Sequence, residues 1–136
     1  METPRGALTV HPGRPAPAPL RSSGLVTACN PASRRLSSEA NQRADAALRA
    51  RIDALGLLTH RTLAHGTGDE AEAWDEPGWC LSGDVRGEVV RLGCDFGQNA
   101  VLWIDGAGEV AIVCTRDGFC GARVGEVLGM GDGAGR

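Results

Sequence analysis

The feature that most restricts the fold is an apolar stripe at helical spacing with a clear beginning and end. The stripe recurs every three or four residues, at Ala44, Leu48, Ile52 and Leu55. This spacing places the four side chains on one face of an α-helix. Ser37 or Ser38 can cap the first turn, and Gly56 suits the left-handed conformation that ends many helices. The sequence therefore predicts an amphipathic helix between these caps.

A second stripe, at Val85, Val89, Leu92 and Phe96, predicts another helix. Asp84 is placed to cap its first turn, and Gly97 is placed to end it. Short apolar segments around the two helices predict strands at Leu25 to Cys29, Leu57 to Leu63, Trp79 to Leu81, Ala100 to Ile104 and Glu109 to Thr115. Asp105-Gly106 predicts the hairpin turn between the last two strands.

The order of these elements is β-α-β followed by β-α-β-β. Strands joined by helices of this length usually lie parallel, whereas the final hairpin must be antiparallel. We therefore expect an α+β fold with a mixed β-sheet of four or five strands. The two helices are expected to pack on one face of that sheet.

The two ends of the chain differ from its centre. Five of the seven prolines lie within the first nineteen residues, and residues 1–35 carry five Arg and one Glu. Glycine dominates the last eight residues. Such compositions resist packing into a core. We expect a Pro/Arg-rich arm at 1–22, a single α+β domain at 23–128 and a Gly-rich tail at 129–136.

Composition narrows the function classes. All fourteen basic residues are Arg, and the chain has neither Lys nor Tyr, which excludes Schiff-base chemistry and phenolic acid catalysis. The five cysteines form no C-x-x-C pair or zinc signature. No apolar run can cross a membrane or serve as a signal peptide, and the basic arm lacks aromatic residues that stack on bases. We expect a cytoplasmic protein that uses no metal or cofactor and binds neither membranes nor nucleic acid.

The first polar motif, Thr27-Ala-Cys-Asn30-Pro31, follows a predicted strand and precedes a helix. Ligands of α/β sheets bind at that edge. The motif equally suits a structural turn, because Asn bonds its own backbone and Pro fixes the exit. Asn41, one turn into the helix, either faces solvent or points back at Asn30 and closes a polar pocket.

Two further motifs carry polar side chains. Trp74-Asp75-Glu76-Pro77 makes Glu76 a candidate general base, because Trp74 can desolvate its carboxylate and raise its pKa. The alternative is a solvated acidic loop in which Trp74 covers the core. Gln98 and Asn99 lie between a helix and a strand, where they either satisfy the strand ends or contact a ligand.

These motifs occur in a familiar order. Thr27 to Pro31, Asn41, Trp74-x-Glu76-Pro77 and Phe96-Gly-Gln-Asn-Ala100 resemble, over residues 25–104, the bacterial family catalogued as domain of unknown function 3293. Its members typically have Trp in place of Cys29, and a longer N-terminal strand-and-helix region in place of the prolines. The resemblance implies a bacterial cytoplasmic protein and implies no activity.

Three function classes remain. The first is a binding module for a small polar molecule such as a nucleotide, with a site formed by Thr27, Asn30, Asn41, Trp74, Glu76, Gln98 and Asn99. The second is a hydrolase with Glu76 as general base, and the third is an interaction domain anchored by Trp74 and Trp79. We expect the first. Gln98 joins Asn30 only if its strand starts beside that loop, whereas a parallel strand normally starts at the opposite edge.

Overall fold

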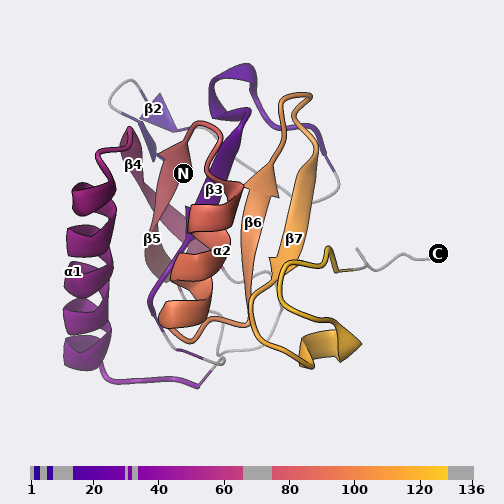
Figure 1. Ribbon diagram of the computed structural model, residues 1–136. Coiled ribbons are helices and arrows are strands. Elements are labelled where there is room, and N and C mark those ends of the chain that lie inside the picture. Colours follow the sequence, from indigo (N-terminus) through magenta and orange to yellow (C-terminus); the bar gives the residue numbers. More distant parts are fainter. Residues whose placement is uncertain are drawn as a thin grey trace.

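The computed structural model describes residues 2–3, 6–7, 14–29, 31, 34–65 and 75–128. Its centre is a five-stranded sheet in the order β4-β5-β3-β6-β7 (Figure 1). The strands are β3 (Ser23–Val26), β4 (Thr59–His65), β5 (Asp75–Ser82), β6 (Ala100–Ile104) and β7 (Val110–Cys114). The helices are α1 (Ser38–Leu55) and α2 (Arg86–Asp95). A separate pair joins β1 (Glu2–Thr3) to β2 (Gly6–Ala7), and short 3-10 turns span Ala18–Leu20 and Phe119–Gly121.

The α+β class, the five strands and the two helices are confirmed, but every strand pair in the described sheet is antiparallel. The parallel neighbours expected in a mixed sheet are therefore absent from the described residues. The strands joined by a helix do run in the same direction, as predicted. However, β5 lies between β3 and β4, and β3 lies between β5 and β6. This is the split β-α-β arrangement, in which a strand from the other unit separates each parallel pair.

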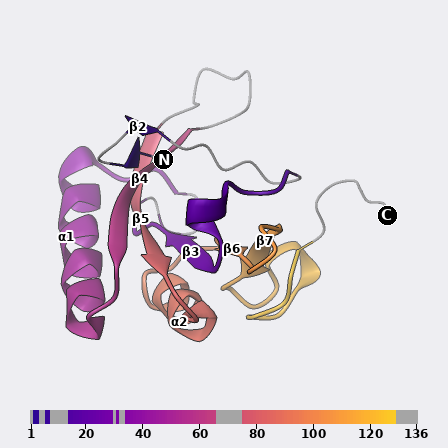
Figure 2. The same cartoon turned by 90° about the horizontal axis from the view of Figure 1, so that it is seen from above.

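Both helices cover one face of the sheet, and residues 14–22 cover the other (Figure 2). The core on the helix side combines buried side chains from both helices and four strands or their ends, namely Val26, Ala28, Leu48, Ile52, Trp79, Leu81, Val85, Val89, Leu92, Val101 and Val113. On the opposite face, Ala16 and Leu20 pack against Cys80 and Ile104. The last part of the predicted proline-rich arm is thus packed on the sheet.

Helix α1 begins and ends where its sequence predicts. The Ser37 hydroxyl accepts a hydrogen bond from the Ala40 N–H at 3.1 Å, and Gly56 adopts a positive φ of 70°. Leu48 and Ile52 are buried, but Leu55 is 44% exposed. Leu55 lies in the last turn of the helix, residues 53–56, which faces solvent as a whole.

Helix α2 begins differently from the prediction. Its N-cap is Val85, with no side-chain capping bond, so the capping role assigned to Asp84 is wrong. Burial of Val85 and Val89 against the sheet holds this helix instead. The contact is close, because a Cβ atom added at Gly24 in β3 would lie 2.5 Å from a methyl carbon of Val89. Packing, more than capping, therefore positions α2.

Candidate functional site

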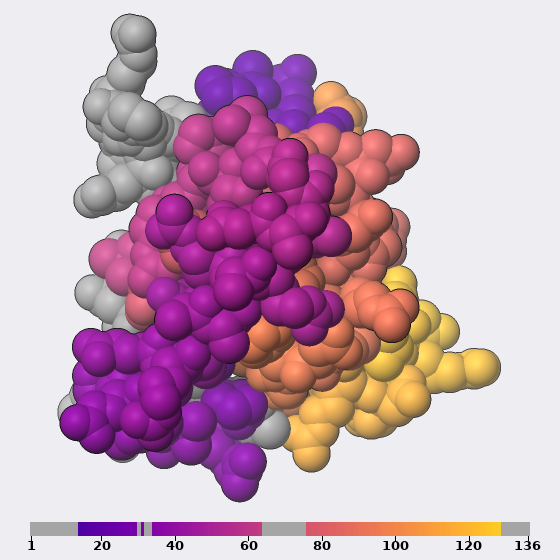
Figure 3. Space-filling view, turned by 60° about the vertical axis from the view of Figure 1, so that its left-hand side comes forward, coloured from indigo at the N-terminus to yellow at the C-terminus, as the bar shows by residue number. Residues whose placement is uncertain are grey.

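A cavity of about 420 Å³ opens where the first half of α1 meets the end of β3 and the β4–β5 pair. Figure 3 views the molecule from the α1 side, with the N-terminal half of that helix at the lower left. The lining residues are Arg35, Asp45, Arg61 and Glu76, the uncharged polar Ser38, Asn41 and Gln42, and Cys29, Leu36 and Pro77. The size is that of a small-molecule site, and the lining carries equal numbers of Arg and acidic residues.

Helix α1 supplies one wall of the cavity. Ser38, Asn41, Gln42 and Asp45 are spaced so that they share one face of the helix over two turns. Asn41 is half-buried in this wall. The predicted second role of Asn41, in a polar pocket, is compatible with this placement.

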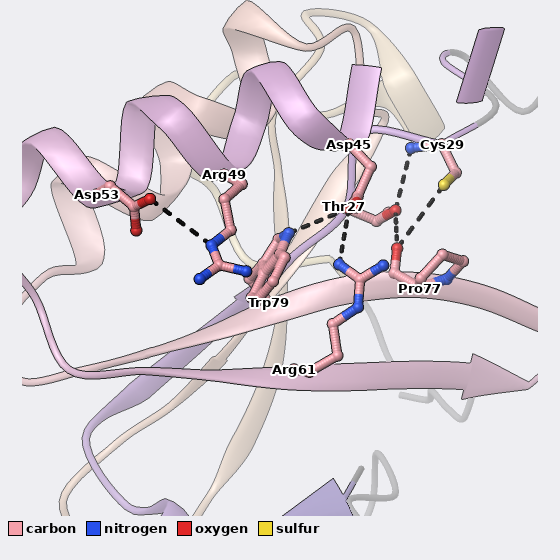
Figure 4. Close-up of polar contacts among 8 residues, drawn as sticks. All are labelled: Thr27, Cys29, Asp45, Arg49, Asp53, Arg61, Pro77 and Trp79. Atoms are coloured by element: carbon pink, nitrogen blue, oxygen red, sulfur yellow. Dashed lines mark hydrogen bonds and ion pairs between the residues drawn. The ribbon is translucent and has the colours of Figure 1, made fainter. Parts of the chain in front are cut away.

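The end of β3 is tied to β5 by the Thr27 hydroxyl, which donates to the Pro77 carbonyl at 2.8 Å. The same hydroxyl oxygen accepts a hydrogen bond from the Cys29 N–H at 3.0 Å. The Cys29 thiol also donates to the Pro77 carbonyl, at 3.7 Å (Figure 4). Thr27 thus shapes the cavity from behind, whereas Cys29, Pro77 and Glu76 line it.

Gln98 braces the same loop from the other side. Gly97 has a φ of 72° and closes α2, and the Gln98 N–H donates to the Gly93 carbonyl at 2.9 Å in a Schellman motif. This fixes the buried Gln98 side chain, whose Nε2 donates to the Cys29 carbonyl at 3.1 Å. Two segments 69 positions apart therefore meet. Gln98 is nevertheless not among the described residues that line the cavity.

Asn99 lies where β6 begins, away from the cavity lining. Its carbonyl accepts a hydrogen bond from the Thr115 N–H at 2.9 Å, and its side-chain oxygen accepts one from Arg116 at 3.3 Å. The hydrogen bonds of Gln98 and Asn99 therefore fit the alternative in which these residues satisfy polar groups around the strand ends. The predicted site residues Asn30 and Trp74 lie outside the described residues.

Three residues on different elements, Asp45, Arg61 and Trp79, form what we call the Trp79 cluster (Figure 4). One carboxylate oxygen of Asp45 accepts from the Trp79 indole N–H at 3.0 Å and from Arg61 Nη1 at 2.9 Å. The Arg61 guanidinium carbon also lies 4.3 Å from the indole centroid, and that of Arg49 lies 4.9 Å from it. Because Trp79 is only 8% exposed, its burial does not fit the alternative in which it anchors a protein partner.

Burial raises the pKa of the Cys29 thiol above its ordinary value. The Thr27 hydrogen bond opposes this effect, the Glu76 and Asp45 carboxylates add to it, and Arg61 opposes it. The thiol consequently stays protonated at neutral pH, which makes it a weak nucleophile. Cys29 therefore lines the cavity as a protonated thiol. No group of three His, Cys, Asp or Glu within the described ranges could hold a metal ion.

Asp45 and Arg61 are not among the site residues predicted from the sequence. For Asp45 a signal existed, because it lies four residues after Asn41 and seven after Ser38, on the polar side of a helix with a known register. For Arg61 no such signal existed. Its role depends on the register of β4 against β5, which pairs it with Trp79.

A family model described as "Protein of unknown function (DUF3293)" matches residues 26–101. This range contains the end of β3, both helices and every residue of the cavity lining. No curated protein and no solved structure matches the chain. Within the described residues, no helix is both long and apolar enough to span a membrane.

Proposed function

Because the chain belongs to the DUF3293 family, whose description names no activity, we propose a function from the site: the cavity beside α1 binds a small polar molecule. The main support for this proposal is the set of residues that line the cavity. Charged groups of both signs and three uncharged polar side chains face one space of about 420 Å³. Such a mixture suits hydrogen-bond recognition of a nucleotide-like or metabolite-like ligand.

Hydrogen bonds within the chain hold the walls of the cavity in place. Thr27 and Gln98 fix the Cys29 loop, and Asp45 fixes Arg61 against Trp79. A preformed site loses less conformational entropy when it binds, which supports a binding role. The proposal includes a bacterial cytoplasmic setting, in which the five cysteines stay reduced.

A hydrolase is the second candidate, because Glu76 lines the same cavity and can act as a general base on a bound molecule. It ranks below binding, since the protonated Cys29 thiol offers no ready nucleophile beside it. We do not propose an interaction domain, because the Trp79 side chain is buried.

A thermal-shift screen of polar metabolites and nucleotides on the full chain tests the binding proposal. A ligand at a hundred times its Kd stabilises the folded state by about 2.7 kcal/mol. Gln42→Trp, which fills the cavity from the exposed side of α1, should abolish the shift. Ala47→Trp, on an exposed position of the same helix outside the lining, should keep it. Hits that survive Gln42→Trp, or a screen without hits, would contradict the proposal.

A further inference from the structure

We infer that Arg61 is the anion anchor of this cavity and that the bound molecule carries a carboxylate. The inference rests on the proposed function and specifies its ligand class. Its basis is the way the Trp79 cluster holds one guanidinium at the cavity wall.

The Arg61 guanidinium is fixed by two different contacts. Nη1 donates to an Asp45 carboxylate oxygen at 2.9 Å, and the guanidinium carbon lies 4.3 Å from the Trp79 centroid. The indole N–H bonds the same carboxylate oxygen at 3.0 Å, so the three groups restrain one another. A planar guanidinium that is already oriented loses little freedom when it binds a ligand.

The same guanidinium keeps hydrogen-bonding capacity for a ligand. It carries five N–H donors, and Asp45 is its hydrogen-bond acceptor among the described residues. The Arg61 side chain is 44% exposed and lines the cavity. In Figure 4 it reaches from β4 toward α1, beside the end of β3 and Pro77. Donors at this wall can therefore meet an anion inside the cavity.

The charge balance of the lining favours a carboxylate over a phosphate. Arg61 and Arg35 face the cavity together with Asp45 and Glu76. A dianionic phosphate would be repelled by both acidic side chains, whereas a carboxylate brings one negative charge. A carboxylate also matches the planar fork of Arg, which can donate two parallel N–H bonds to it.

The test is an NMR titration of the ¹⁵N-labelled full chain with two matched pairs and one further anion. The pairs are nicotinate with nicotinamide and orotate with uracil, and the further anion is inorganic phosphate. Each acid should shift the Trp79 indole N–H signal, identified from a Trp79→Phe variant, and bind at least tenfold more tightly than its uncharged relative. Arg61→Gln should remove this preference.

Arg51→Gln is the matched control. Arg51 also donates to an aspartate at 2.9 Å and lies near an aromatic ring, but it does not line the cavity. This variant should keep the full preference for acids. Arg61→Lys keeps the charge and loses the planar fork, so it should lower the preference at least threefold. It also provides the test if Arg61→Gln does not fold.

Each other outcome overturns a defined part of the account. If the acids and their uncharged relatives bind equally, and Arg61→Gln changes neither affinity, Arg61 is not an anion anchor. The proposed function stands in that case. Binding of phosphate in preference to both acids refutes the ligand class. If Arg61→Lys binds as the parent chain does, the planar fork is irrelevant. If neither nicotinate nor orotate binds, while the thermal-shift screen yields hits that Gln42→Trp abolishes, the carboxylate inference is refuted and the proposed function stands.

Discussion

Two Arg–Asp pairs in this molecule share the same chemistry and differ in their surroundings. In the Trp79 cluster, Arg61 meets Asp45 at 2.9 Å, and on the α1–α2 side Arg51 meets Asp95 at 2.9 Å. Each guanidinium also lies near an aromatic ring, at 4.3 Å from Trp79 and 6.0 Å from Phe96. The Asp45 side chain is 17% exposed, whereas that of Asp95 is 41% exposed.

The two pairs differ in the contacts of their aspartates, and only the first pair lines the cavity. Asp45 accepts from two donors at once, and one of them is a buried indole N–H. Asp95 belongs to an exposed pair of the kind that contributes little to stability. We therefore expect the first pair to stabilise and orient the cavity wall and the second to be nearly neutral.

Truncation of the two aromatic residues should have the largest effect. Trp79→Ala removes a buried ring from the core and should lower the free energy of unfolding by about 3–5 kcal/mol. Phe96 is only half-buried, so Phe96→Ala should cost about 1–2 kcal/mol. Urea unfolding followed by circular dichroism measures both. Equal costs would show that Trp79 has no special place in the core.

Removal of the two carboxylates should have a smaller effect. Asp45→Ala leaves the buried Trp79 N–H without its acceptor and should cost about 1–3 kcal/mol. Asp95→Ala breaks an exposed pair and should cost less than about 0.5 kcal/mol. The same unfolding experiment compares them. A larger loss for Asp95→Ala would reverse the proposed contrast.

The smallest effect concerns alkaline pH. The pKa of Cys29 is raised in the folded state, mainly by burial, so the stability linked to its protonated thiol is present below the unfolded value of 9.0 and is lost as pH rises above it. The parent chain should therefore lose stability relative to Cys29→Ala between pH 8 and pH 10.

Arg61 lowers the pKa of Cys29, so Arg61→Gln should raise that pKa further, and Arg51→Gln should leave it unchanged. The ¹³Cβ chemical shift of Cys29 followed against pH measures this difference. An identical titration in both variants would place Arg61 too far from the thiol to share its cavity.

Local signals in the sequence were sufficient for the helices. The Ser37 cap, the Gly56 end and the buried Leu48 and Ile52 follow from short-range preferences that need no knowledge of the sheet. At the start of α2, the N-cap is Val85 and not the predicted Asp84. Tertiary packing overrides the local capping preference there. Leu55 lies on the same stripe but is exposed, so the stripe does not reveal where the helix stops packing on the rest of the molecule.

The order of strands could not be predicted from the same signals. Whether β3 pairs with β4 directly or accepts β5 between them depends on contacts far apart in sequence. This choice decides the site, because β6 runs antiparallel to β3 and its first residues lie beside the end of β3. The expected obstacle to bringing Gln98 near the Cys29 loop therefore does not arise, and Gln98 bonds the Cys29 carbonyl.

Only part of the candidate site was visible in the sequence. Asn41 and Glu76 line the cavity, whereas Thr27 and Gln98 hold its walls by hydrogen bonds. The charged residues Asp45 and Arg61 were missed, because their meeting requires both the face of α1 and the register of β4. The polar motifs indicate which loops lie near the cavity, and the strand pairing decides which side chains line it.

A crystal structure of the full chain with nicotinate tests the central claim most directly. The Arg61–Asp45 and Arg51–Asp95 pairs are then compared within one molecule at one ligand concentration. We expect the carboxylate inside the cavity, within hydrogen-bonding distance of about 3 Å from the Arg61 guanidinium, and no nicotinate at Arg51. Nicotinate bound at Arg51, or bound elsewhere while the cavity lacks it, would contradict the account.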